Sequence, residues 1–248
     1  MPKLSVCTFN ILAQSYIRHN IREGRARAFC EWSYREPLLQ NFIETQLQTM
    51  IIGCQEAETK VIKGFEKCLP RHQFFYSQRS KSPDGLLLML HEACQVQSFR
   101  AIPLCNEKNI ERRIAQIVDC KVQEQEFRLV NLHLDYDGRD RKDGFLQLQQ
   151  ICAVLISLVP RPTLLFGDFN ITANSRTFQT IIKNGFSAVD TSLATCYTSR
   201  WSRVDHVFYS PKFQMNEIQI LKISEEPIPN ENWGSDHIPI FCQFQILG

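Results

Sequence analysis

Short apolar or alternating runs recur along the whole chain, and polar connections separate them. Runs of this length that are rich in Val, Ile, Leu and Phe are typical of β-strands. The pattern predicts strands at residues 4–9, 50–54, 74–77, 85–91, 114–121, 127–134, 163–167, 203–209, 218–223 and 238–245.

Helical periodicity fills some of the gaps between these runs. Residues 34–48 are apolar at positions 38, 39, 42, 43 and 47, and residues 144–158 are apolar at 145, 148, 151, 152, 155 and 158. This is the spacing of one helix face. Two more helices are predicted at residues 58–68 and 174–184, the second with Asn174 or Ser175 as its N-cap and Gly185 just beyond its end.

The connections and the burial pattern together indicate the fold class. The run at residues 85–90 is apolar at every position, which is typical of a strand buried on both faces, whereas other runs alternate. Connections of hairpin length and of helix length both occur. We therefore predict an α/β protein in which helices pack outside mixed sheets, with residues 1–248 forming a single domain.

Composition excludes several classes of protein. Hydrophobic residues make up 44% and charged residues 22% of the 248, so disordered, collagen-like and coiled-coil proteins are excluded. The net charge of +2 gives no evidence for a polybasic nucleic-acid module, although an enzyme could still bind a few phosphates locally.

Targeting signals and cysteine usage bear on the compartment. The longest apolar stretches are shorter than the roughly 18 residues of a membrane span, and the N-terminus has no signal-peptide architecture. None of the ten cysteines forms a Cys-x-x-Cys motif, and several lie inside apolar runs. They are expected to be buried thiols in a reducing compartment, the cytoplasm or alternatively the nucleus.

Polar residues that interrupt the apolar runs near their ends are the candidates for chemistry. Each one alone could be a cap or a solvated rim residue. Together they could converge on one pocket, because catalytic groups gather where loops meet over a rigid scaffold. The set comprises Asn10, Glu56, His133, Asp168, Asn170, Asp205, Asp236 and His237.

These residues lie in a series of motifs that resembles a known family. Thr-Phe-Asn10, Gln-Glu56, Asn131-Leu-His133, Gly-Asp168-Phe-Asn170, Arg-Val-Asp205 and Ser-Asp236-His237 follow one another in the order found in the endonuclease/exonuclease/phosphatase superfamily. The resemblance extends over residues 4–244. It implies the fold of deoxyribonuclease I, a four-layer α/β sandwich of two mixed sheets flanked by helices.

Within the superfamily the chain is most similar to the branch of the carbon catabolite repressor deadenylases, nocturnin and the Angel proteins. Asn10-Ile-Leu-Ala-Gln, Trp32-Ser-Tyr-Arg35, Asp84-Gly85 and His133-Leu carry this similarity. The sequence departs from the branch in two motifs, where Asn-Leu-His replaces Asn-Thr-His and Asp-His replaces Asp-Tyr at 205–206.

The resemblance implies a magnesium site, with manganese as a substitute. Glu56 would be the main ligand, and Asn10 would orient it or reach the ion through water. Asp236 would hold a second ion or complete the ligand shell. Magnesium favours oxygen ligands and keeps several waters, so one or two carboxylates suffice.

The resemblance also implies the catalytic groups. Asp168 would accept a proton from the attacking water, and the Asn170 amide would donate to the phosphate. His237 would be protonated against the phosphoryl oxygen and held by Asp205. His133 would supply a further donor to the transition state.

Further residues beside these motifs are weaker candidates for contacting a substrate. Tyr136 and Trp233 could stack on a base or simply pack their loops, and Arg139 could bind a substrate backbone or be one member of a solvated mixed-charge loop. Asn131 is included because it lies in the His133 motif. His206 is predicted to be structural, because it is adjacent to Asp205 and so faces the other side of the strand.

The predicted function is that of a magnesium-dependent phosphodiesterase or nuclease. Single-stranded RNA is the favoured substrate, with 3′ exonuclease or deadenylase activity implied by the branch resemblance alone. The alternatives are hydrolysis of another phosphoester, such as a nucleotide, a phosphoinositide or a DNA end, and a non-catalytic nucleic-acid-binding module. The complete set of acid, amide and histidine positions argues against the last of these.

Overall fold

Two six-stranded sheets form the centre of the computed structural model, which describes residues 3–22, 24–46, 48–136, 142–189, 192–221 and 226–247. The first sheet has the strand order β13-β14-β1-β2-β4-β3. Its strands are β1 (Lys3–Asn10), β2 (Ile51–Glu58), β3 (His72–Gln78), β4 (Asp84–His91), β13 (Phe213–Ile220) and β14 (Ile240–Ile246).

The second sheet has the order β5-β6-β7-β8-β12-β9. Both sheets are mixed, since β1 pairs with β2 and β7 with β8 in parallel while the other pairs are antiparallel. A separate two-stranded hairpin consists of β10 (Cys196–Tyr197) and β11 (Trp201–Ser202). The strands of the second sheet are β5 (Gln95–Cys105), β6 (Glu111–Val122), β7 (Gln125–His133), β8 (Thr163–Asp168), β9 (Ser187–Ala188) and β12 (Asp205–Tyr209).

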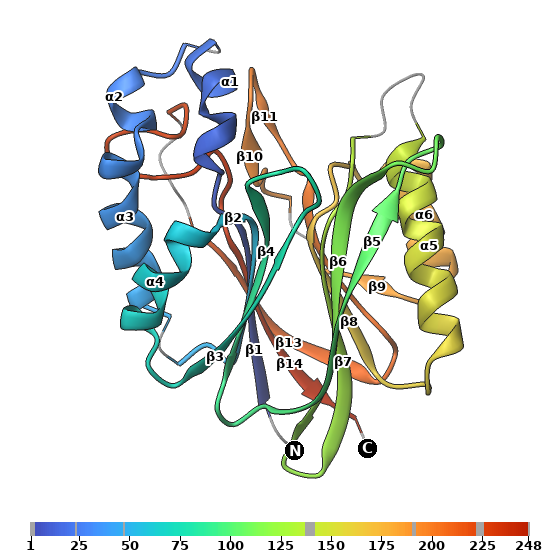
Figure 1. The fold of residues 1–248 in the computed structure, drawn as a ribbon. Helices are drawn as coiled ribbons and strands as arrows, with labels where there is room; N and C mark the ends of the chain where they lie inside the picture. The colour runs from blue at the N-terminus through green and yellow to red at the C-terminus, as the bar shows by residue number, and fades with distance from the viewer. Residues whose placement is uncertain are drawn as a thin grey trace.

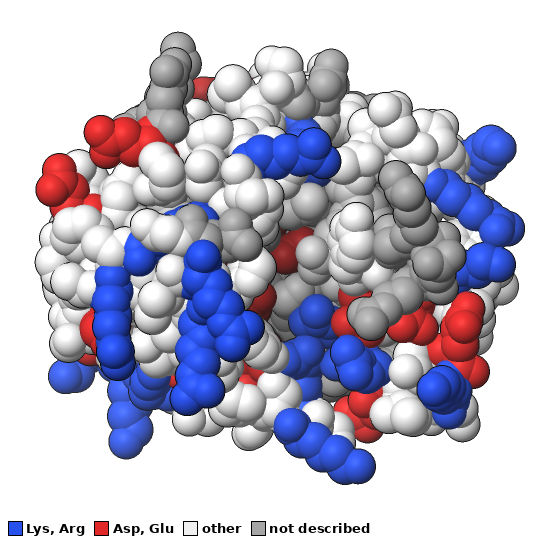
Figure 2. Space-filling view, turned by 90° about the horizontal axis from the view of Figure 1, so that it is seen from above, with Lys and Arg blue, Asp and Glu red and all other residues white. Residues whose placement is uncertain are grey.

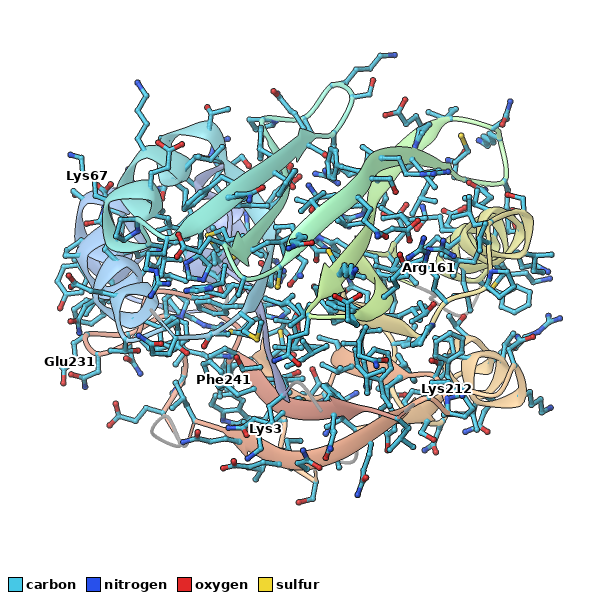
Figure 3. The ribbon with its side chains drawn as sticks, turned by 90° about the horizontal axis from the view of Figure 1, so that it is seen from below. Lys3, Lys67, Arg161, Lys212, Glu231 and Phe241 are labelled. Atoms are coloured by element: carbon cyan, nitrogen blue, oxygen red, sulfur yellow. The ribbon has the colours of Figure 1, made fainter. Side chains whose placement is uncertain are left out.

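Helices cover the outer faces of the two sheets, as Figures 1 and 3 show from the side and from below. A short 3-10 turn, η1 (Gln14–Tyr16), leads into the first helix. The helices beside the first sheet are α1 (Ile17–Arg22), α2 (Arg27–Cys30), α3 (Trp32–Glu44) and α4 (Thr59–Cys68), and those beside the second are α5 (Asp143–Ser157) and α6 (Arg176–Lys183). The four-layer α/β sandwich expected from the sequence is confirmed.

The inner faces of the sheets pack directly on each other. Val6 of β1, Leu88 of β4, Leu129 of β7 and Phe166 of β8 belong to one buried apolar cluster. At Gly53 of β2 the sheets approach so closely that an added Cβ would lie 2.4 Å from the Phe166 ring. Close packing of this kind fixes how the two sheets lie against each other at this point.

Most predicted elements occur; the differences lie at the sheet edges and at α1 and α2, two short helices that were not predicted. β4 is buried along nearly its whole length, as its apolar run predicted. β5 was not predicted, because this edge strand contains Pro103 and a register shift between Val96 and Ser98, both of which interrupt the alternation expected of a strand. The strand predicted at 218–223 lies at Phe213–Ile220 instead, because a β-bulge between Met215 and Glu217 interrupts the alternation of its first half.

The termini of α6 lie close to the residues predicted for them. Ser175, rather than Asn174, is the N-cap of α6, and its Oγ accepts a hydrogen bond from the Phe178 amide at 3.1 Å. Gly185 follows the helix with a φ of +86°, a conformation in which glycine avoids the strain of a side chain.

Two further expectations concern the cysteines and the membrane. All ten cysteines are free thiols, and most of them are buried. Among the helices of the described residues, none combines the length and the apolar character needed to cross a membrane.

Candidate active site

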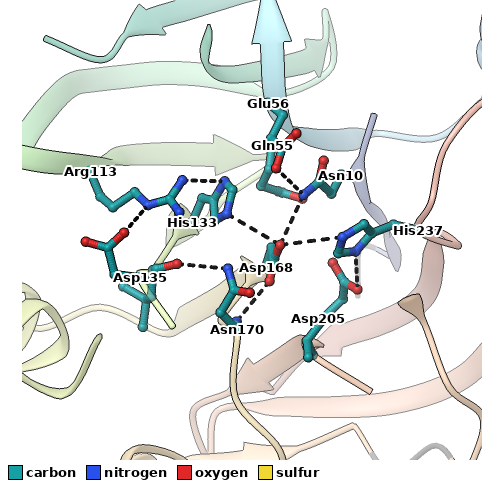
Figure 4. A network of polar contacts seen from close by, with 12 residues as sticks. Asn10, Gln55, Glu56, Arg113, His133, Asp135, Asp168, Asn170, Asp205 and His237 are labelled. Atoms are coloured by element: carbon teal, nitrogen blue, oxygen red, sulfur yellow. Dashed lines mark hydrogen bonds and ion pairs between the residues drawn. The ribbon is translucent and has the colours of Figure 1, made fainter. Parts of the chain in front are cut away.

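Strand register places three of the expected site residues side by side at the upper end of the second sheet. His133 is paired with Asp168 across β7 and β8, and Asp168 is paired with Asp205 across β8 and β12. Paired residues on neighbouring strands project to the same face of a sheet. The three side chains therefore converge at one point (Figure 4).

The first sheet contributes Asn10 and Glu56 from the ends of two parallel strands. Glu56 lies at a β-bulge of β2 and has a φ of 58°, an uncommon backbone conformation that turns its side chain out of the strand alternation. The Asn10 amide donates to Glu56 Oε1 at 3.2 Å and to Asp168 Oδ2 at 3.0 Å. This one amide thus connects the two sheets at the site.

The segment before β14 brings Asp236 and His237 to the same place. Ser235 Oγ donates to the Asn10 carbonyl at 2.7 Å and accepts from the His237 amide at 3.1 Å. The Trp233 indole donates to the His237 carbonyl at 2.7 Å. These contacts fix the segment from both ends and so orient the His237 ring.

His237 and Asp205 form a buried pair. His237 Nδ1 lies 2.8 Å from Asp205 Oδ2, and the two residues are 6% and 1% exposed. Burial alone would lower the pKa of His237, but the Asp205 carboxylate outweighs it and holds that pKa well above the usual value. His237 is therefore an imidazolium at neutral pH.

His133 has the opposite environment. Arg113, near the start of β6, places Nη1 at 3.2 Å from His133 Nδ1, and its Nε donates to Asp135 Oδ1 at 2.8 Å. Burial, together with the Arg113 charge, holds the pKa of His133 well below its usual value. The imidazole of His133 is therefore neutral.

Asp168 lies between the two histidines. Its Oδ2 is 3.5 Å from His133 Nε2 and 3.8 Å from His237 Nε2, and its Oδ1 accepts from the Asn170 amide at 2.9 Å. Burial and the neighbouring Asp205 raise the pKa of Asp168 to about 7. A carboxylate with this pKa suits the role of a general base at neutral pH.

Asn170 follows Asp168 at a φ of 52°. This backbone conformation lets its own amide cap Asp168 while its side chain donates to the Leu134 carbonyl at 3.0 Å. Asn170 also lines the cleft, where its amide is adjacent to the base.

The donor set fits a divalent cation at Glu56 and Asp236. Both carboxylates line the same cleft, and burial followed by the charge of Asp236 raises the pKa of Glu56. Asp236 Oδ2 accepts from the Asn20 amide at 3.0 Å, whereas its buried Oδ1 accepts no hydrogen bond from any residue that the structure describes. A half-buried and a buried carboxylate that line one cleft, with Asp236 Oδ1 free of hydrogen bonds from the described residues, match the oxygen ligands that magnesium prefers.

A second grouping of possible ligands consists of Asp168, Asp205 and His237, whose oxygen and nitrogen atoms lie within 4.8 Å of one another. We favour a hydrogen-bonded triad at this position. The Nδ1 of His237 is already bonded to Asp205, and a protonated imidazole has no lone pair for a metal.

A cleft of about 330 Å³ opens over these residues, and it contains Glu56, His133, Asp168, Asp236 and His237. Seen from above, the molecule is hollowed near its centre, with acidic side chains deep in the hollow and basic side chains beside it (Figure 2). Cys196 and Asn20, which the sequence did not indicate, also line this cleft.

Two neighbouring pockets extend the cleft in both directions. One, of about 390 Å³, contains Tyr136 and Arg200 and shares Asn170 and Thr198 with the cleft. The other, of about 420 Å³, shares Tyr16 and Arg113 with the cleft and contains further basic residues, Arg79, Lys81 and Arg112. Together they form one groove with the carboxylates at its middle.

The weaker sequence candidates are placed differently from one another. Tyr136 is 64% exposed and lines the groove, as predicted for a stacking residue. Asn131 has no exposed surface and bonds Gln55 and Gln116 between the sheets, so its placement does not support substrate contact. Arg139 lies outside the described residues.

Trp233 requires the same correction as Asn131. Its ring packs against Phe9 and Phe42 at centroid distances of 5.4 and 5.3 Å, and the residue is only 8% exposed, so it is not available to stack on a base. Trp233 orients His237 instead. His206 faces away from the site and bonds the Ile171 carbonyl at 2.9 Å, in agreement with its predicted structural role.

The sequence matches the endonuclease/exonuclease/phosphatase family over residues 34–237. The chain belongs to this family. The resemblance drawn from the motif series is thereby confirmed, and with it the general activity of the family, metal-dependent hydrolysis of phosphoester bonds.

Solved structures share the fold across nearly the whole chain at low sequence identity. ANGEL2, a 2′,3′-cyclic phosphatase in complex with adenosine-2′,3′-vanadate, has a TM-score of 0.83 at 19% identity, covering 98% of this chain and 96% of that one. A mannosyl-6-phosphatase of Bacteroides thetaiotaomicron has a TM-score of 0.79 at 18% identity, with 98% and 100% covered.

The human nocturnin catalytic domain with bound sulfate has a TM-score of 0.74 at 19% identity, covering 99% of this chain and 94% of that one. No curated protein sequence matches this chain.

The geometry defines what these residues can do to a bound phosphoester. Asp168 can take a proton from a water that attacks phosphorus. His237 and the side-chain amide of Asn170 can donate to the phosphoryl oxygens. A divalent ion held by Glu56 and Asp236 would supply Lewis-acid polarisation of the phosphate. Asp205 keeps His237 charged throughout, so one end of the site can offset developing negative charge.

Proposed function

We propose that this protein is a magnesium-dependent phosphodiesterase that hydrolyses single-stranded RNA from its 3′ end. Manganese is the expected substitute ion. The observation that carries the proposal is the groove that continues on both sides of Asp168. A diester phosphate has a group on each side, whereas a terminal monoester would fill only one of the two pockets.

The basic side of the groove suits a further phosphate of the chain. Arg112 and Lys81 are exposed there, and Arg79 is held in place by an ion pair with Asp84 at 2.5 Å. The basic residues of this pocket are Arg79, Lys81, Arg112 and Arg113, so it can contact only a few phosphates. A short single-stranded end therefore fits better than a long duplex.

The opposite side suits a nucleoside. Tyr136 offers an exposed ring, and stacking on an aromatic ring stabilises a single-stranded base by roughly 1–3 kcal/mol. Hydroxyl groups of Thr172, Thr198 and Ser199 line the same pocket, where they can bond ribose hydroxyls. The adenosine-2′,3′-vanadate bound to ANGEL2 supports a ribonucleotide at the end of the substrate.

The test is a substrate panel assayed with magnesium, with manganese and with a chelator. It contains a 5′-labelled oligoribonucleotide, the matching oligodeoxyribonucleotide, adenosine 2′,3′-cyclic phosphate, mannose 6-phosphate, a soluble phosphoinositide and bis(p-nitrophenyl) phosphate. We expect stepwise shortening of the RNA from its 3′ end, abolished by the chelator. Preferred hydrolysis of a monoester or of the cyclic phosphate, with intact RNA, would overturn the substrate assignment.

The metal assignment is tested separately with two glutamates of the same strand. Glu56→Gln should raise the magnesium concentration for half-maximal activity, because so few ligands hold the ion. Glu58→Gln is the matched control, since Glu58 accepts from the Ser15 amide at 3.1 Å and pairs with Lys60 at 2.8 Å. A magnesium shift of the same size in both variants would show that Glu56 is not the ligand.

A further inference from the structure

A chain of polar contacts leads from helix α5 to Nδ1 of His133. Gln147 on α5 holds Asp135 twice, accepting from its amide at 2.8 Å and donating to its Oδ2 at 2.9 Å. Asp135 Oδ1 in turn accepts from Arg113 Nε at 2.8 Å, and Arg113 Nη1 lies 3.2 Å from His133 Nδ1 (Figure 4).

The chemistry of the guanidinium determines where the His133 proton is. Every nitrogen of an arginine side chain is a donor, and the group stays charged at all ordinary pH values. Arg113 can therefore bond His133 only if Nδ1 presents its lone pair. The single ring proton of the neutral imidazole must then be on Nε2, the nitrogen that lies 3.5 Å from Asp168 Oδ2.

We propose that Arg113 is a positioning residue that fixes His133 as the neutral tautomer with its proton on Nε2. In this form His133 donates into the cleft, to Asp168 when the site is empty and to a phosphoryl oxygen when substrate is bound. The opposite tautomer would present a lone pair to the phosphate and would repel it. The consequence for catalysis rests on the proposed phosphodiesterase activity, whereas the tautomer itself does not.

The contacts around Arg113 explain why an arginine suits this position. Its Nε and Nη1 use two different edges of one rigid plane, so Asp135 and His133 are bonded at the same time. Its side chain is only 15% exposed and Asp135 is 8% exposed as a residue, which keeps the arrangement away from competing water. Lysine carries all of its donors on one nitrogen at the end of a flexible chain, so it would not hold both partners in this fixed geometry.

The decisive experiment is NMR of protein labelled with ¹⁵N in its histidine rings, with the His133 signals identified by their loss in His133→Asn. In the wild type, at neutral pH and without substrate, we expect Nδ1 to resonate as an unprotonated nitrogen and Nε2 as a protonated one. A wild-type spectrum with the proton on Nδ1, or on both nitrogens, would overturn the proposal without any variant at Arg113.

Arg113→Met removes the donor while keeping much of the side-chain volume, and its His133 signals should shift toward a mixture of tautomers. Arg113→Lys retains a donor and should restore part of the wild-type spectrum. Arg112→Met is the spectroscopic control, because Arg112 lies 3.8 Å from Asp135 and does not contact His133. Unchanged His133 signals in folded Arg113→Met would contradict the proposal.

Kinetics with bis(p-nitrophenyl) phosphate, a diester that has no second phosphate for the basic side of the groove, give the second readout. Arg113→Met should lower kcat by up to about 10²-fold with little change in KM, the loss typical of removing one donor to a developing oxyanion. A rise in KM with kcat unchanged would mean that Arg113 binds substrate rather than positions His133.

Discussion

The Nε2 atoms of His133 and His237 lie 3.5 and 3.8 Å from the same oxygen of Asp168. Their Nδ1 atoms, on the other side of each ring, face groups of opposite charge. His237 Nδ1 bonds the Asp205 carboxylate, and His133 Nδ1 accepts from the Arg113 guanidinium. The two rings are buried to a similar degree, at 6% and 3% exposure. Burial therefore does not explain why one is charged and the other neutral.

The partner of each ring decides its protonation. The carboxylate raises the pKa of His237 even though burial opposes it, and burial with the guanidinium lowers the pKa of His133. A third buried histidine, His206, bonds only a backbone carbonyl, and burial lowers its pKa to about 4. The site thus obtains one cationic and one neutral donor from the same side chain, without placing two positive rings against each other.

The largest effect on turnover is expected at Asp168, whose carboxylate both imidazole rings approach. Asp168→Asn keeps the shape of the side chain but removes the base, so turnover should fall by about 10²–10⁴-fold. The measurement is single-turnover hydrolysis in magnesium, with circular dichroism to verify folding. Near-wild-type turnover would show that Asp168 is not the general base.

A double-mutant cycle tests whether Asp205 and His237 act as a unit. Asp205→Asn leaves the ring present but less often charged, and His237→Ala removes it, so each should cost much of the rate and the double variant little more than the worse single one. His206→Ala is the matched control on the opposite face of β12. Simple additivity of the two losses, or a larger loss in folded His206→Ala than in His237→Ala, would contradict the pairing.

The raised pKa of Asp168 predicts a dependence of stability on pH. The carboxyl binds its proton more tightly in the folded state, about pH 7 against an unfolded value near 4, so its contribution to stability falls as pH rises between these values. Asp168→Asn removes the buried charge. Its Tm should exceed that of the wild type at pH 8, by roughly 2–4 °C per kcal/mol, and the gain should shrink at pH 5.

This comparison is made by thermal unfolding in a chelator, so that metal binding does not contribute to either protein. An equal Tm difference at pH 5 and pH 8 would show that Asp168 has an ordinary pKa in the folded protein. The Asp168 carboxylate would then be charged at neutral pH despite its burial beside Asp205.

The smallest effect is expected at Arg112, the neighbour of Arg113 that lies outside the histidine contact. Arg112→Ala should weaken binding of an oligoribonucleotide a few-fold and reduce the salt slope of its affinity by about 0.7, the value for one phosphate contact on a single strand. Hydrolysis of bis(p-nitrophenyl) phosphate should change little. Arg100→Ala, an exposed position on β5, is the control, and equal effects of the two variants would exclude a specific contact.

Local sequence determined much of the site. Asn10, Glu56, His133, Asp168 and Asp205 could be located because each polar residue interrupts an apolar run near its end. Parallel and antiparallel pairing then brings such ends to one edge of a sheet. The order of the motifs was sufficient to predict the family, and the family match covers most of the chain.

Tertiary structure decided what the local pattern could not carry. β5 was missed because a register shift and Pro103 interrupt its alternation, and Trp233 was misjudged because its loop folds into the core beside Phe9. Arg113 lies at the start of β6, where the sequence is polar. Its proposed role in orienting His133 depends on Asp135 and Gln147, which come from later segments. Periodicity in the sequence indicates which side chains are buried. The protonation state of a buried histidine depends on the sign of the charge beside it. Which charged residue lies there is decided by how strands distant in the sequence pack together.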